Sequence, residues 1–170
     1  MSSVGETLMG TFGMTDYLVP LVLEDLSDED ARKRARDDEG PSIAWIVGHL
    51  LHYRHHVMGL LGAERENPWE EQFAEAEATD GSDYPTVAEL ADAWERVADD
   101  FAAVMTSVSD QDFEQPAVGV HEERTLRDQV VFYAWHEGYH MGALGAQLKR
   151  LGYLGPADKV GAARRARSEI

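Results

Sequence analysis

The sequence predicts an all-α fold, an antiparallel four-helix bundle with long connections between its helices. Four segments repeat apolar residues at steps of three and four, which is the period of an α-helix. Little of the sequence alternates in the manner of a β-strand, and two long connections lie near residues 63–85 and 109–124. Helices with one apolar face bury it against one another, so a bundle is the expected architecture.

The first predicted helix covers residues 3–26, and its apolar face includes Leu8 and Phe12. Pro20 falls inside this segment. We expect it to kink or interrupt the helix, because proline removes a backbone donor and crowds the preceding turn. The charged residues 32–39 that follow are expected to form a solvated face or a linker.

The second predicted helix begins at Ser42, whose side chain can cap its N-terminus, and reaches about Leu61. Residues 43–48 are nearly all apolar, so this part of the helix should be buried on most sides. Four histidines then interrupt the apolar sequence: His49, His52, His55 and His56.

Capping boxes mark the starts of the third and fourth predicted helices. In residues 86–89 and 125–128, a threonine is followed three residues later by a carboxylate. The third helix extends to about Val108 and has the strongest amphipathic pattern in the chain, which core packing explains fully. The fourth helix reaches about Gly152 and completes the predicted bundle.

Three glycines lie inside the fourth predicted helix, at Gly138, Gly142 and Gly145. Each costs about 1 kcal/mol of helix stability relative to alanine. We therefore expect another helix or a ligand to come close to the backbone at these positions. The alternative is a weak helix that the fold tolerates.

Size and composition limit the possible functions. The chain has 170 residues, 44% of them hydrophobic, which suffices for one globular domain with a full core. It has no run of about 18 apolar residues and no visible signal peptide, so a cytoplasmic location is expected. The net charge of −17 argues against nucleic-acid and anionic-membrane partners. Because the chain has no cysteine, any metal must be held by His, Asp or Glu.

The fourth predicted helix contains two histidines four residues apart, His136 and His140. At this spacing the side chains point only about 40° apart around the helix, one turn above the other. Both imidazoles can therefore reach a single ion. The pattern is short and has many chance matches, so the alternative is two unrelated histidines, one packed and one solvated.

The histidines of the second helix offer further ligands. His49 directly follows the apolar run and can share a helix face with His52 or His56. It cannot easily share one ion with His56, which lies roughly 10 Å away along the helix. His55 points to a different side and is expected to be solvated.

Two parts of the chain resemble the DinB-like (YfiT-like) family, whose members are proposed metalloenzymes. One part is Ser-Ile-Ala-Trp-Ile-Val-Gly-His-Leu at residues 42–50. The other begins with Thr-Leu-Arg-Asp at 125–128, continues with His-Glu-Gly-Tyr-His-Met-Gly at 136–142 and closes with Leu-Lys-Arg-Leu-Gly at 148–152. Both occur in the order and at the separation that the family uses.

The resemblance implies a single bundle domain over residues 1–155, followed by a peripheral tail at 156–170. It implies that three histidines hold a divalent metal ion, with zinc and nickel the metals most often suggested. Some family members are thiol S-transferases or isomerases that use a low-molecular-weight thiol, many have no known activity, and many are homodimers. The implied metal ligands are His49, His136 and His140.

A site with three imidazole ligands leaves an open position, which is typical of catalytic rather than structural metal sites. Such an ion lowers the pKa of a bound water to about 7 or ionises an incoming thiol. His52 is our candidate for a catalytic group beside the ion. Glu137 points roughly 100° away from His136, so we expect it to face the surface or another helix rather than act as a general base.

Three functions remain open from the sequence. The first is a metal-dependent enzyme, a thiol S-transferase or hydrolase, with an accessible ion and a cavity for a small molecule. The second is a non-catalytic metal-binding or stress-response module, whose site is closed by a fourth protein ligand or lacks a pocket. The third is a helical dimerisation domain without metal, in which the histidines are scattered.

Overall fold

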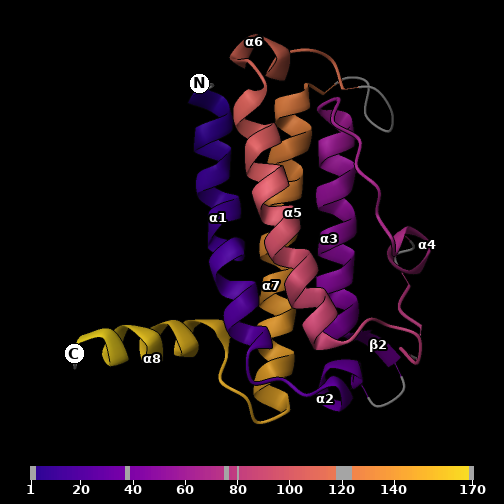
Figure 1. Cartoon of the computed structure of the whole chain (residues 1–170), viewed down its shortest axis with the longest axis vertical. Helices are drawn as coiled ribbons and strands as arrows, with labels where there is room; N and C mark the ends of the chain where they lie inside the picture. Colours follow the sequence, from indigo (N-terminus) through magenta and orange to yellow (C-terminus); the bar gives the residue numbers. More distant parts are fainter. Residues whose placement is uncertain (1–2, 37–38, 75–76, 80, 118–123, 169–170) are drawn as a thin grey trace.

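Four long helices form the body of the protein (Figure 1). The computed structural model describes residues 3–36, 39–74, 77–79, 81–117 and 124–168. The all-α bundle predicted from the sequence is confirmed. Around the bundle, α1 contacts α5 and α7, and α3 contacts the same two helices from the other side. The four helices are α1 (Ser3–Leu23), α3 (Ile43–Leu60), α5 (Val87–Ser107) and α7 (Leu126–Arg150).

Not every pair of neighbouring helices is antiparallel. After α3, the connection at residues 61–86 returns along the whole length of the bundle (Figure 1). Consequently α5 starts at the same end as α3 and runs in the same direction, whereas α1 and α7 run the opposite way. Hydrogen bonds fix the two ends: Val87 N donates to Asp28 Oδ1 at one, and Ser3 Oγ donates to Asp110 Oδ2 at the other.

The predicted helix starts are confirmed by their caps. Ser42 Oγ accepts a hydrogen bond from Trp45 N at 3.1 Å. Thr86 and Thr125 each form a complete capping box, in which the threonine oxygen accepts from the third helical residue and that residue's carboxylate accepts in return. Each box satisfies backbone donors that the first turn of a helix leaves free.

Two short segments differ from their sequence predictions. α1 continues through Pro20 to Leu23, so the interruption predicted as one of two possible effects of this proline was wrong, and the kink stays a prediction. The charged stretch predicted as a solvated face or linker contains an antiparallel hairpin. Gln147 of α7 donates to Lys33 O at 2.6 Å, which ties the hairpin's start to the bundle. The two strands are β1 (Arg34–Arg36) and β2 (Glu39–Ser42).

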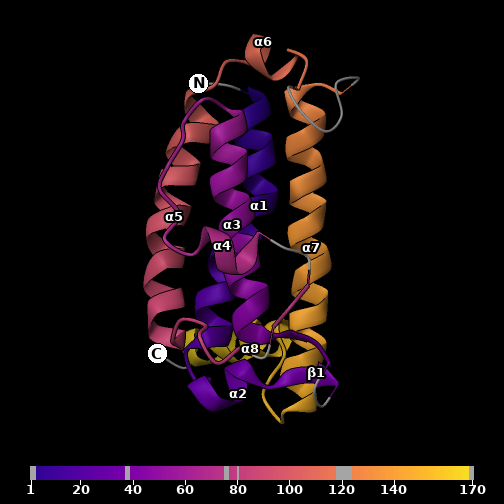
Figure 2. The same ribbon diagram turned by 90° about the vertical axis from the view of Figure 1, so that its right-hand side faces the viewer.

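The connection after α3 carries the short helix α4 (Glu70–Phe73), which lies against α3 (Figure 2). Its Phe73 is almost fully buried, and it packs on the backbone of Gly48. A Cβ added at Gly48 would lie only 2.3–2.5 Å from three atoms of the Phe73 ring. Glycine is therefore required at this position for α4 to sit where it does.

The glycines of α7 behave differently from the prediction. Among the described residues, nothing lies within 4 Å of a Cβ built at Gly138 or Gly142. Only Gly145 has a close neighbour, since Pro156 Cδ would lie 3.1 Å from its Cβ. The prediction that another helix approaches Gly138 and Gly142 is therefore wrong for the described part of the chain, and the approach of a ligand stays a prediction.

The remaining helices lie at the ends of the bundle. α8 packs on α1 through Lys159, whose Nζ donates to Leu21 O and lies 3.0 Å from Asp25 Oδ2. Its far end projects away from the bundle (Figure 1). None of the helices in the described part of the chain is long and apolar enough to cross a membrane. These elements are α2 (Asp28–Arg32), α6 (Asp110–Phe113) and α8 (Pro156–Ser168).

Candidate metal centre

Three histidines from two helices converge inside the bundle. His49 comes from α3, and His136 and His140 come from successive turns of α7. Each offers one ring nitrogen, and these three nitrogens all lie within 4.8 Å of one another. The predicted convergence is therefore confirmed, and we keep metal binding itself as a prediction.

The spacing of the nitrogens suits one small ion. Nε2 of His136 and Nε2 of His140 are 3.0 Å apart. Two ligands that each bind zinc at about 2.0–2.1 Å with a tetrahedral angle lie roughly 3.3 Å from each other. The ring centre of His49 lies 5.2 Å from that of His136 and 4.9 Å from that of His140. The donor set therefore fits a divalent metal ion.

His49 is held in place by the residues around it. Its Nδ1 lies 3.2 Å from the carbonyl oxygen of Phe73, so a proton on Nδ1 can be donated there. That tautomer leaves the lone pair of Nε2 free, as in metal sites where a second hydrogen bond orients the ligand. The ring of Trp45 stacks on His49 with centres 4.3 Å apart. By contrast, Nδ1 of His136 is buried without a partner among the described residues.

The electrostatic environment keeps the three imidazoles neutral. Burial lowers the pKa of His49 to about 3, and the neighbouring His140 and His136 add to this effect. Burial also lowers the pKa of His136 to about 4, with His140 contributing. Burial lowers the pKa of His140 in the same direction. Neutral imidazole is the form that binds metal, so protons compete little at neutral pH.

Aromatic rings surround the three imidazoles on the side of α3. The ring of Tyr53 lies 4.7 Å from both His49 and His136, with its plane steeply inclined to each. Tyr133 stacks on Tyr53 at 5.2 Å. Trp45 is almost fully buried, and its indole N–H has no acceptor among the described residues. The wall of the site is thus largely aromatic, and Trp45 contributes a donor that no described residue uses.

Comparison with known proteins agrees with this architecture. The sequence model of the DinB superfamily matches residues 14–144, which is most of the chain and includes all three histidines. The chain belongs to the DinB superfamily.

A solved structure similar to this DinB-superfamily chain is that of a DinB-like protein from Bacillus cereus. The TM-score is 0.68 at 15% sequence identity, and the match covers 86% of this chain and 92% of the other. At so low an identity, the likeness shows the fold alone. No curated protein matches the chain.

His52 is not one of the three converging imidazoles of this DinB-superfamily bundle. Its ring lies 5.2 Å from that of Tyr53, which in turn contacts His49 and His136. Nδ1 of His52 lies 3.4 Å from the side-chain nitrogen of Asn67. Burial lowers the pKa of His52. A role for His52 beside the ion stays a prediction.

The other two histidines of α3 lie farther along the helix. His55 is half-buried, and its Nδ1 has no hydrogen-bond partner in the described part of the chain, so the predicted solvated position was wrong. His56 is exposed. Both line a cavity of about 270 Å³ together with His52, Glu64 and Glu70. The cavity is lined mainly by polar side chains, and none of the three converging histidines lines it.

The sequence analysis missed a second buried polar cluster, centred on Arg54. This arginine is 1% exposed, and its Nε lies 2.7 Å from Oε1 of Glu137. Its other nitrogens bond to Asp16 and to Thr15, whose hydroxyl donates to Glu137. Although burial opposes the charged form, Glu137 and Asp16 hold the pKa of Arg54 above its usual value.

A signal for this cluster was present in the sequence. Arg54 follows Leu50 by four residues and precedes Val57 and Met58 by three and four, so it occupies a core position of the helix. A charged residue at a core position needs a buried partner of opposite charge. The expectation that Glu137 faces another helix is confirmed by its ion pair with Arg54.

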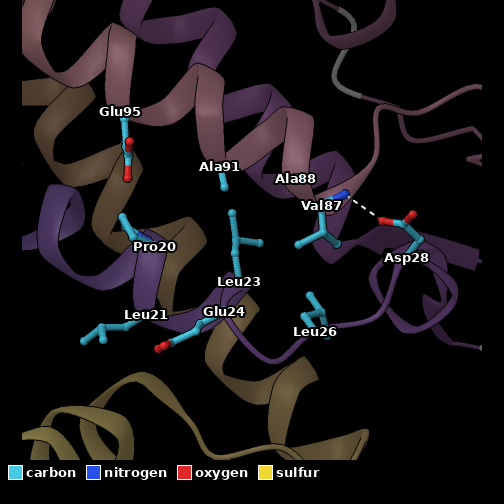
Figure 3. Close-up of a pocket in the computed structure, with 10 residues that line it drawn as sticks. All are labelled: Pro20, Leu21, Leu23, Glu24, Leu26, Asp28, Val87, Ala88, Ala91 and Glu95. Carbon is cyan, nitrogen blue, oxygen red and sulfur yellow. Dashed lines mark hydrogen bonds between the residues drawn. The ribbon is translucent and has the colours of Figure 1, made fainter.

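A larger cavity of about 630 Å³ lies away from the three histidines, between the end of α1 and the start of α5. Figure 3 shows Leu23, Val87 and Ala91 around the hollow, with the carboxylates of Glu24 and Glu95 nearby. None of the three converging imidazoles lines it. It is therefore not the space beside the candidate metal centre.

Proposed function

We propose that this DinB-superfamily protein is a divalent-metal-dependent enzyme that acts on a small molecule. The observation that carries the proposal is the set of three neutral, largely buried imidazoles whose nitrogens lie within 4.8 Å of one another. Three polar rings are removed from water here, and among the described residues Nδ1 of His136 has no hydrogen-bond partner. Burying such groups costs free energy, which a bound ion would recover.

The number of ligands favours catalysis over a structural role. Among the described residues, three ligand atoms lie close enough to one another to share an ion, and all three belong to histidines. Three protein ligands leave a position for water or substrate, whereas structural zinc sites are usually closed by four. A bound divalent ion supplies a Lewis acid at that position. Imidazole suits zinc, nickel, copper and iron, and we propose zinc or nickel.

The chain's own residues would hold and orient the reactants. The carbonyl of Phe73 fixes the tautomer of His49. Tyr53 and Tyr133 would exclude water from one side of the reacting group, and the unused indole N–H of Trp45 would donate a hydrogen bond to a polar atom of the substrate. His52 is the proposed proton acceptor, with the 270 Å³ cavity as the route by which substrate arrives.

Two reaction classes fit this arrangement. In thiol transfer, the sulfur of an external thiol would form a bond to an electrophilic carbon of the second substrate while the bond from that carbon to its leaving group breaks. The thiol proton would pass to His52, and the leaving group would depart with the electron pair of the broken bond. In hydrolysis, water takes the place of the thiol. The chain contains no cysteine, so any thiol must come from outside. A cytoplasmic location, which we retain as part of the proposal, keeps small thiols reduced.

The experiment is an activity screen of protein loaded with zinc or nickel against low-molecular-weight thiols paired with electrophiles, and against small esters. We expect metal-dependent turnover that His52→Gln lowers by about 10²-fold or more at saturating substrate, as for removal of a proton-transfer group. Glu6→Gln is the control, because Glu6 is exposed on α1 and does not line this cavity. Stoichiometric metal binding without turnover of any class would contradict the enzyme and favour the non-catalytic module.

A further inference from the structure

The cavity of about 630 Å³ between α1 and α5 has no part in the function proposed above. Figure 3 shows the residues that line it, which come from the end of α1, from the turn that leads into α2 and from the first three turns of α5. Cavities of about 300–1,000 Å³ are usual for small-molecule sites. This one is therefore large enough to hold a small organic ligand.

Small residues on α5 leave the room for this cavity. Ala88, Ala91 and Glu95 are three and four residues apart, so they lie on one face of the helix. All three line the cavity, which places that face toward the end of α1. Leu90 and Trp94, which point to another side of α5, are almost fully buried in the core. Because an alanine methyl group fills much less volume than these side chains, the gap to α1 stays open.

The wall of the cavity is mostly apolar and is only partly covered by the rest of the chain. Leu23 and Leu26 are almost fully buried. Leu21, Val87 and Ala91 also line the cavity and are half-buried. Apolar side chains in this position gain free energy when a ligand removes them from water. The wall therefore favours a ligand with an apolar body.

Every charged residue that lines the cavity is acidic. These residues are Glu24, Asp28 and Glu95. Oδ1 of Asp28 accepts a hydrogen bond from Val87 N at 2.7 Å, drawn as a dashed line in Figure 3, so this carboxylate caps the start of α5. Among the described residues, the carboxylates of Glu24 and Glu95 have no hydrogen-bond or ion-pair partner. Two carboxylates at the cavity are thus available to a cation.

The lysine that packs on the end of α1 does not neutralise these two carboxylates. Lys159 of α8 donates to Leu21 O at 2.7 Å, lies 3.0 Å from Asp25 Oδ2, and does not line the cavity. The whole chain carries a net charge of −17, so its field attracts cations and repels anions. The charge at the cavity therefore disfavours an anionic ligand and complements a cationic one.

We propose that this cavity is a second binding site, which takes a small organic ammonium ion with an apolar body. The body would lie against Leu23, Val87 and Ala91, and the ammonium group would donate hydrogen bonds to Glu24 and Glu95. A primary ammonium group has three donors, so it can serve both carboxylates at once. None of the three converging histidines lines the cavity, so this site does not depend on the candidate metal centre.

The first test titrates the full chain, without added metal, with three probes that share one apolar body, and follows the backbone amides by NMR. Hexylammonium carries the cation, hexanol has no charge, and hexanoate carries the opposite charge. We expect hexylammonium to bind about threefold to tenfold more tightly than hexanol, because ion pairs to exposed carboxylates add only modest affinity. Hexanoate should bind most weakly, and the amides of Leu23, Val87 and Ala91 should shift. Binding of hexanol as tight as that of hexylammonium, or shifts confined to the surroundings of His49 and His136, would overturn the proposal.

The second test separates charge from shape with two kinds of variant. Glu24→Gln with Glu95→Gln keeps the shape, and we expect hexylammonium to bind about threefold to tenfold more weakly, at the level of hexanol. Ala91→Leu fills the hollow and should weaken both probes by about tenfold or more, with unchanged helix content by circular dichroism. The matched control, Glu6→Gln with Glu66→Gln, removes two charges from exposed positions outside the cavity and should bind as the wild type does. Unchanged binding in the Glu24/Glu95 variant, or an equal loss in the control, would contradict the site.

A fourth probe decides whether the ammonium group belongs to a small molecule or to a protein side chain. Nα-acetyl-lysine methylamide carries the same charge on a short apolar stem, with two peptide groups at the other end. We expect it to bind at least about threefold more weakly than hexylammonium, because its peptide groups would lose water in an apolar hollow. Binding as tight as that of hexylammonium would assign the cavity to a lysine of a partner protein and overturn the small-molecule site.

Discussion

Two buried polar clusters join α3 to α7, and they differ in how their polar atoms are paired. In the first, Arg54 has ion pairs to Glu137 and Asp16 and a face against the ring of Trp94 at 4.3 Å. In the second, none of the described residues supplies a counter-charge to the three imidazoles, Nδ1 of His136 has no partner, and burial lowers the pKa of each ring. The two clusters are adjacent in sequence, since Glu137 directly follows His136.

This difference distinguishes a cluster that supports the fold from a cluster that is a candidate functional site. A polar cluster whose members satisfy one another fixes how two helices pack, and it needs nothing from outside the chain. A polar cluster that remains unsatisfied costs stability, and such groups are typical of sites completed by a ligand. On this comparison, Arg54 and Glu137 set the rotation of α7, and the three histidines are the residues that we propose bind an ion.

The largest expected effect is on the satisfied cluster. Glu137→Ala leaves Arg54 buried with only Asp16 as its charged partner, so we expect a loss of about 3–5 kcal/mol in the free energy of unfolding, measured with denaturant. Glu137→Gln keeps a hydrogen-bond acceptor and should lose less. A loss under about 1 kcal/mol for Glu137→Ala would contradict the structural role of the pair.

A smaller effect is expected where α4 supports the unsatisfied cluster. Gly48→Ala forces the Phe73 ring away, so we expect a loss of about 1–3 kcal/mol in the free energy of unfolding. Because the Phe73 carbonyl orients His49, metal affinity measured by titration should fall by about 10–100-fold.

The matched control for Gly48 is Gly13→Ala in α1, where nothing lies within 4 Å of the added Cβ. This change should leave metal affinity unaltered and raise helix stability by up to about 1 kcal/mol. If Gly48→Ala bound metal as tightly as Gly13→Ala, the support of His49 by α4 would be wrong.

The smallest effect tests whether the two clusters are separate. Thr15→Val keeps the shape of the side chain and removes the hydroxyl that donates to Glu137. We expect a loss of about 1 kcal/mol in the free energy of unfolding. Metal affinity should not change, because Thr15 contacts neither histidine of α7. A tenfold change in metal affinity in this variant would show that the clusters are coupled.

The sequence predicted those parts of the fold that depend on local chemistry. Helix starts at Ser42, Thr86 and Thr125 followed from capping residues, and the convergence of His136 with His140 followed from helical spacing. His49 could be added only through the family resemblance, because spacing within one helix says nothing about the position of another helix.

What the sequence did not predict depends on tertiary context. Pro20 is accommodated within α1, and part of the charged stretch at residues 32–39 pairs in a hairpin, because neighbouring elements compensate for poor local propensity. The glycines at Gly138 and Gly142 were predicted to lie close to another helix or a ligand, but no helix among the described residues comes near them. Local sequence patterns do not predict the path of the connection between α3 and α5. They therefore could not predict that α5 runs in the same direction as α3.

The most direct test of the comparison is the metal content of protein purified without a histidine tag and supplied with zinc or nickel. We expect one equivalent per chain, with a rise in melting temperature equivalent to about 2.7 kcal/mol when free metal is 100 times the dissociation constant. The double variant His136→Ala with His140→Ala should bind none, whereas His55→Ala with His56→Ala should bind as the wild type does. A wild type without metal and without a thermal shift, or a His136/His140 variant that retains both, would contradict the assignment of this cluster as a metal centre.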